Sequence, residues 1–187
     1  MFLQRLSKYS DINRETKKGR DENRVQWKAP IEGWWKINVD TAVVGDMGSG
    51  MGIVIRDCRG KVERAGAHQV QENWSPEITE AKAAEFGMRT AWQMGIDHII
   101  RESDCMALIT MLKSKSFPYN YFGLSDKVVS ELVGMFDNCQ FIFTHRDGKF
   151  VAHSLAHLTP YSIRFWIGSI PESILPLLLL EASGLND

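Results

Sequence analysis

Three consecutive strand patterns between residues 34 and 70 limit what this chain can fold into. In the first, Trp35, Ile37 and Val39 alternate with residues of a second, more polar face that ends at Asp40. This period of two is typical of a β-strand. The connections to the next two strand patterns are a glycine-rich loop and a short turn, and such connections join antiparallel neighbours. The segment therefore predicts an antiparallel meander.

The pattern changes at Ser75, where Ser-Pro-Glu has the composition of a helix start. The serine hydroxyl suits the N-cap, proline suits the first helical position, and the acid lies near the positive end of the helix dipole. We expect this helix to reach about Met94 and to end at Gly95. The elements expected after it are a strand at 97–103, helices at 104–115 and 121–136, a strand at 139–146 and a helix at 150–158.

This order of elements predicts an α/β fold. Its centre would be a five-stranded mixed sheet, with three antiparallel strands followed by alternating helices and strands, and helices would flank the sheet. The chain has 187 residues and is 44% hydrophobic, which suits one domain with a single core. We expect a flexible polar tail at residues 1–26, the domain at 27–160 and a C-terminal extension at 161–187.

Charge and cysteine usage restrict the function classes. The formal net charge is −1, so a nucleic-acid partner would need a local basic patch. The three cysteines lie far apart and form no CxxC pair, which argues against a disulfide framework or a zinc site and for a reducing compartment. No stretch approaches the roughly 18 apolar residues of a membrane helix. We expect no membrane association and an intracellular location, in the nucleus or the cytoplasm.

Three acids stand at positions where chemistry is common. Asp40 lies near the end of the first strand, although an aspartate there also suits the start of a turn. Asp104 follows a strand, where α/β sites collect, although it also suits a helix N-cap. Glu80 shares its helical face with small residues only, so it should point at the sheet, where a carboxylate needs a partner, a proton or a metal. The small residues of that face are Ala84, Gly87 and Ala91.

If these carboxylates converge, they form a set of hard oxygen ligands that suits Mg²⁺ or Mn²⁺. Two such ions would clamp the attacking and leaving oxygens of a phosphodiester. The residues alone thus indicate a metal-dependent phosphodiester site at one edge of the sheet.

Four blocks of the sequence resemble the ribonuclease H type 1 domain, and most of all its plant, retrotransposon-derived version. They begin with "GWWKINVDTAV" and "EITEAKAAEFG" and continue with "IIRESDCMALI" and "FTHRDGKFVAHSLAHL". The similarity extends over residues 27–158. It implies metal-dependent endonucleolytic hydrolysis of the RNA strand of RNA–DNA hybrids. It also implies that Asp40, Glu80 and Asp104 are metal ligands and that His153 stands at the position of a fourth acid.

The last block departs from the family pattern in a way that bears on catalysis. His153 offers a neutral imidazole in place of an anionic ligand, and Lys149 stands where the family usually has asparagine. Earlier in the chain, Thr41 replaces a common glycine. A cation near the second ion would oppose its binding, so we expect a two-ion site whose second ion is weakly held. Reduced activity follows, and the alternatives are an inactive nucleic-acid-binding module and a structural domain without nucleic acid.

The resemblance extends to further candidate residues. His145 could assist proton transfer or product release, or be an ordinary strand-end histidine. Lys113 and Lys115 could contact DNA phosphates, or be a solvated helix end. The loop candidates for contact with the RNA strand are Met47, Gly48, Ser49 and Gly50. We expect a monomer whose partner is an RNA–DNA hybrid or another nucleic acid.

Overall fold

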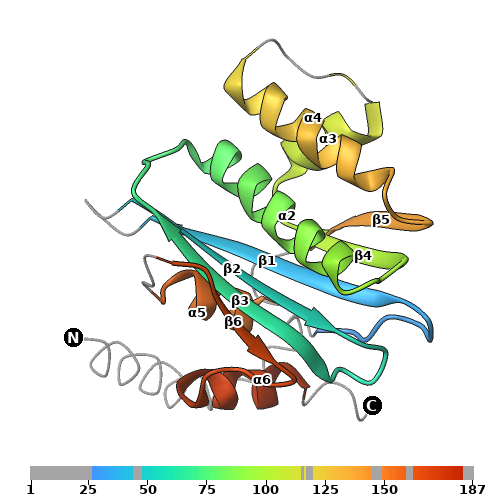
Figure 1. Cartoon of the computed structure of the whole chain (residues 1–187), viewed down its shortest axis with the longest axis vertical. Coiled ribbons are helices and arrows are strands. Elements are labelled where there is room, and N and C mark those ends of the chain that lie inside the picture. The colour runs from blue at the N-terminus through green and yellow to red at the C-terminus, as the bar shows by residue number, and fades with distance from the viewer. Residues whose placement is uncertain are drawn as a thin grey trace, which may run out of the picture.

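A computed structural model describes residues 27–43, 48–114, 116, 120–144, 149–158 and 162–182. Its centre is a six-stranded mixed sheet with helices on both faces (Figure 1). In chain order the strands are β1 (Trp35–Val43), β2 (Ser49–Arg56), β3 (Val62–Val70), β4 (His98–Ser103), β5 (Asn138–Phe143) and β6 (Arg164–Ile167). In space their order is β5-β4-β1-β2-β3-β6.

The directions of the strands confirm the predicted mixed sheet. β1, β2 and β3 form the antiparallel meander, while β4 runs parallel to β1 and β5 runs parallel to β4. The sixth strand, β6, pairs antiparallel with β3 and is a correction to the expected five. Its four residues are too few for a periodicity to be recognised in the sequence.

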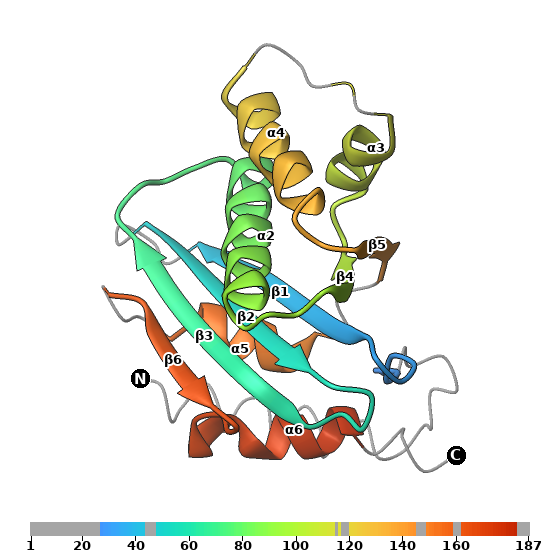
Figure 2. The ribbon, with the colours of Figure 1, turned by 45° about the vertical axis from the view of Figure 1, so that its right-hand side comes forward.

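The helices form a layer on each side of the sheet (Figure 2). On one side lie α2 (Pro76–Gln93), α3 (Met106–Ser114) and α4 (Tyr121–Val133); on the other lie α5 (Phe150–Ala156), the short 3-10 helix η4 (Glu172–Ile174) and α6 (Leu175–Ala182). None of the described helices has the length and apolar composition that a membrane crossing requires.

Helix α2 begins and ends close to where the sequence predicts. Pro76 is its first residue, and Gly95 follows it in the left-handed conformation with φ of 71°, as a glycine beyond a helix end commonly does. The serine cap is only partly as expected. The Ser75 hydroxyl makes no capping hydrogen bond, and the Ser75 carbonyl accepts one from the Thr79 amide at 3.0 Å.

The small residues of α2 allow the helix to lie close against β1. A Cβ on Gly87 would lie 3.0 Å from side-chain carbons of Ile37 and Val39, so a larger residue would push the helix outward. Ala84 and Ala91 on the same face are fully buried. The sequence-based prediction that Glu80 faces the sheet is therefore confirmed, because Glu80 is also buried, one turn before Ala84.

On the opposite face, α5 touches the sheet backbone at Gly52. A Cβ on Gly52 would lie 2.1 Å from the Ala152 carbonyl oxygen of α5, so only glycine fits here. Gly52 pairs with Asp40 in the β1–β2 register. This contact therefore brings α5, with His153 on it, next to the carboxylate of Asp40.

Candidate metal centre

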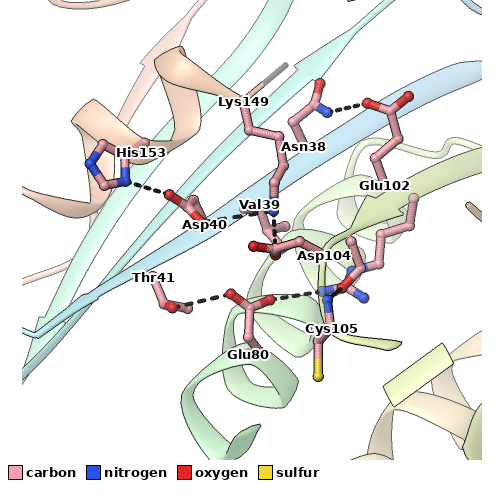
Figure 3. A network of polar contacts seen from close by, with 12 residues as sticks. Asn38, Val39, Asp40, Thr41, Glu80, Glu102, Asp104, Cys105, Lys149 and His153 are labelled. Atoms are coloured by element: carbon pink, nitrogen blue, oxygen red, sulfur yellow. Dashed lines mark hydrogen bonds and ion pairs between the residues drawn. The ribbon is translucent and has the colours of Figure 1, made fainter. Parts of the chain in front are cut away.

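The three predicted acids converge at one edge of the sheet (Figure 3). One carboxylate oxygen from each of Asp40, Glu80 and Asp104 lies within 4.8 Å of the others. Strand register explains the proximity, because Asn38 pairs with Glu102 across the parallel strands β1 and β4, and Asp40 and Asp104 each follow two residues later. The convergence inferred from the sequence is therefore present in the structure.

Asp40 lies on the sheet face covered by α5 and is 4% exposed. Its Oδ2 lies 2.6 Å from Nδ1 of His153, whose side chain is 40% exposed. His153 thus contacts the first acid directly, from the helix where the family resemblance placed a fourth acid. The imidazole thus forms a hydrogen bond with the Asp40 oxygen that faces α5.

Lys149 reaches the other side of the same cluster. Its ammonium donates to Asp104 Oδ1 at 2.7 Å and to the Val39 carbonyl at 3.3 Å. It also lies 3.8 Å from Asp40 Oδ1. The Lys149 residue is 1% exposed, so a protein cation is buried between the first and third acids (Figure 3).

Glu80 is held by residues that the sequence did not single out for this purpose. Its Oε1 accepts a hydrogen bond from the Thr41 hydroxyl at 3.1 Å, and its Oε2 lies 3.8 Å from Nη2 of Arg101. Burial raises the pKa of the Glu80 carboxyl, and the nearby charges of Arg101 and Lys149 act in the opposite direction. The residue that replaces the family's glycine therefore orients a candidate ligand.

The second polar network, on the α5 face of β1, fixes the strands beneath the site. The Trp27 indole donates to Asn38 Oδ1 at 2.8 Å, and the Asn38 amide donates to Glu102 Oε2 at 2.6 Å. Lys36 forms an ion pair with Glu102 at 2.6 Å. These buried bonds join β1 to β4 two residues before Asp40 and Asp104 in the chain. They therefore help to hold Asp40 beside Asp104.

Behind Glu80 lies a buried pair of opposite charges, Arg101 on β4 and Asp126 on α4. Both residues are fully buried. Among the described residues, neither the Arg101 guanidinium nor the Asp126 carboxylate has a hydrogen-bond partner. Burial raises the pKa of Asp126 to about 7, against the attraction of Arg101. Nothing in the sequence selects either residue, because a single charged residue within a strand or helix carries no signal that it is buried.

Asp126 is expected to make the stability of the domain depend on pH. Its pKa rises from 3.8 in the unfolded chain to about 7 in the fold, so between these values the folded state binds the extra proton. Stability should then fall by about 2.5 kcal/mol between about pH 5 and about pH 8. We expect urea denaturation to show a shallower pH slope for Asp126→Asn. Asp137→Asn, at an exposed position, is the control; an unchanged slope in Asp126→Asn would contradict this assignment.

Some of the remaining predicted site residues lie outside the described part of the chain and some within it. His145, Met47 and Lys115 lie outside the described residues. Lys113 is exposed in the last turn of α3. Gly48, Ser49 and Gly50 are buried, and the Ser49 hydroxyl donates to the Glu72 carbonyl at 2.9 Å. The roles of these residues in nucleic-acid contact or catalysis stay predictions.

The donor set suits a hard divalent ion. Three carboxylates in close proximity are typical ligands of Mg²⁺ or Mn²⁺. The Lys149 ammonium, 2.7 Å from Asp104, places a positive charge where further ligand oxygens would be needed. The cluster could therefore bind a metal, and a protein cation already lies beside one of its acids.

The fold and its acidic edge define a ribonuclease H-like domain. The structure is similar to ribonuclease H1 of Halobacterium salinarum, with a TM-score of 0.58 and 19% identity over 66% of this chain and 94% of that one. It is also similar to the N-terminal ribonuclease H domain of a Mycobacterium tuberculosis protein, with a TM-score of 0.60 and 15% identity over 66% of this chain and 90% of that one. These likenesses establish the fold.

Sequence comparison gives the family. Residues 38–159 match the family described as "Reverse transcriptase-like", and the chain belongs to this family of ribonuclease H domains. It is 28% identical, over 106 residues, to the "Putative ribonuclease H protein At1g65750" of Arabidopsis thaliana. The match covers 54% of this chain and 17% of that relative, so the chain spans less than a fifth of the curated protein that it matches.

Proposed function

We propose that this domain hydrolyses the RNA strand of RNA–DNA hybrids in a metal-dependent, endonucleolytic reaction. The observation that carries the proposal is the convergence of Asp40, Glu80 and Asp104 within 4.8 Å. Membership of the ribonuclease H family supports it. So does the likeness to LC11-RNase H1, whose structure is a complex with an RNA/DNA hybrid, at a TM-score of 0.57 and 16% identity over 65% of this chain and 92% of that one.

In this proposal the three acids hold Mg²⁺ or Mn²⁺. When bound, such an ion activates water as a nucleophile and stabilises the charge that develops on the phosphate. The chain's own residues orient the ligands: Thr41 holds one oxygen of Glu80, and His153 holds one oxygen of Asp40. Water is the attacking group, so the mechanism needs no serine or cysteine nucleophile.

A second candidate is a binding module that holds hybrid without cutting it. The contacts of Lys149 with Asp104 and of His153 with Asp40 favour it, because each occupies a carboxylate oxygen that metal binding would require. Asp40 has both of its oxygens within reach of these two residues. The two candidates differ in cleavage and agree in hybrid binding, so one experiment separates them.

The test is cleavage of a hybrid labelled on its RNA strand, beside double-stranded RNA and double-stranded DNA of the same sequence. We expect cuts in the RNA of the hybrid only, with Mn²⁺ at least as effective as Mg²⁺ and no cuts in EDTA. Binding to each duplex is measured in parallel by mobility shift at low salt. Hybrid binding without cleavage in either ion would overturn the hydrolase in favour of the binding module. Neither binding nor cleavage would exclude both.

A further inference from the structure

Lys149 occupies a position in the centre that a metal ligand set does not explain. It is the N-cap residue of α5, and its side chain runs back through the interior to the acids, with no exposed surface of its own. Burying an ammonium costs free energy unless partners compensate for the lost water. The ammonium contacts Asp104, the Val39 carbonyl and Asp40, which all belong to the centre or to strand β1 within it.

We propose that the Lys149 ammonium is a built-in counter-ion of the acidic cluster. It holds Asp40 and Asp104 together without a metal ion, and it lowers the affinity of the cluster for a divalent cation. This inference rests on the proposed metal site, but it concerns assembly and affinity rather than cleavage.

The charges of the centre support this inference. Asp40, Glu80 and Asp104 bring three negative charges, and two buried cations, Lys149 and Arg101, lie within 3.8 Å of one or more of them. One negative charge is therefore left uncompensated by these cations when all three acids are ionised. The charge of one divalent ion, +2, is larger than this residual negative charge, and the charge of two ions is four times as large. Mutual repulsion among three clustered carboxylates is the usual reason why such a site needs a metal to assemble, and here that repulsion is already reduced.

The geometry shows why the cation competes with a metal and does not merely accompany it. The ammonium is 2.7 Å from Oδ1 of Asp104, which is a charge-assisted hydrogen bond at full strength. A metal ion that bound this oxygen would either displace the ammonium, which would leave Lys149 buried with weaker partners, or share the oxygen with it. An ion bound through Asp104 would therefore either break this ion pair or lie close to a buried like charge, and both cost free energy.

Metal-binding calorimetry with Mn²⁺, in the absence of nucleic acid, tests the proposal. Lys149→Asn and Lys149→Met should each bind Mn²⁺ at least about 10-fold more tightly than the wild type. Their melting temperatures should fall in EDTA and rise on addition of Mn²⁺, because a ligand of the folded state stabilises it. Lys61→Asn is the matched control, because Lys61 is exposed and forms a salt bridge with Glu63, away from the acids. Its Mn²⁺ affinity and melting temperatures should equal those of the wild type.

Equal Mn²⁺ affinity in the wild type and both Lys149 variants would overturn the proposal. The wild type supplies a second measurement that does not depend on how the variants fold. Because Lys149 already holds the acids together, the melting temperature of the wild type in micromolar Mn²⁺ should be the same as in EDTA, and a rise of several degrees at that concentration would also overturn the proposal. Neither measurement involves cleavage. A failure of the cleavage assay would therefore not decide whether this inference is correct.

Discussion

Asp40→Asn is expected to lower hybrid cleavage more than about 100-fold while leaving the fold intact. Loss of a residue that only supports a metal ligand typically costs 10- to 100-fold, so loss of a ligand should exceed that range. Asparagine has the same shape and keeps one oxygen and one donor for the contact with His153. The substitution removes the negative charge that faces both His153 and Lys149, and with it the hard anionic donor.

The measurement compares initial rates on labelled hybrid for proteins purified identically. Asp97→Asn is the matched control, because Asp97 is exposed just before β4 and away from the acids; its rate should equal that of the wild type. Circular dichroism establishes that each variant is folded. Cleavage by Asp40→Asn at the wild-type rate would mean that the activity belongs to a contaminating nuclease or to other residues.

The general plan of the fold could be predicted because it depends on local patterns. Alternation in β1 assigned Asp40 to one face, and the row of small residues after Glu80 showed which side of α2 packs on the sheet. Both are properties of neighbouring residues in the chain. Once the strands pair in parallel, the positions of Asp40 and Asp104 follow from the register.

The contacts within the centre could not be predicted in the same way. The bond from Lys149 to Asp104 joins residues 45 positions apart, and its existence depends on how closely α5 approaches the sheet. The family resemblance predicted that Lys149 lies near the second ion, but the sequence did not show which residues its ammonium contacts. Arg101 lies in β4, whose sequence HIIRES gives no sign that its guanidinium is fully buried. Such long-range pairs carry no periodic signal.

Gly52→Ala is expected to destabilise the domain by about 3 kcal/mol or more and to disturb the acidic centre. The new Cβ would lie 2.1 Å from the Ala152 carbonyl oxygen and 2.4 Å from the Ala156 amide nitrogen. These are backbone atoms of a helix, so relief requires a shift of α5 as a whole. Overpacking of a core usually costs about 1 to 3 kcal/mol, and a clash with backbone belongs at or above the upper end of that range.

The same shift would move His153 and Lys149, the two α5 residues that touch Asp40. Chemical denaturation measures the loss of stability. Gly134→Ala is the control, because its Cβ would lie 3.4 Å from the Glu131 carbonyl oxygen, which is an ordinary contact, and its backbone φ is −68°. This substitution should change the free energy of unfolding by less than about 1 kcal/mol. Wild-type stability in Gly52→Ala would show that α5 does not rest on β2 at this point. The close contact at Gly52 would then no longer explain why α5 lies near enough to the sheet for Lys149 to reach Asp40 and Asp104.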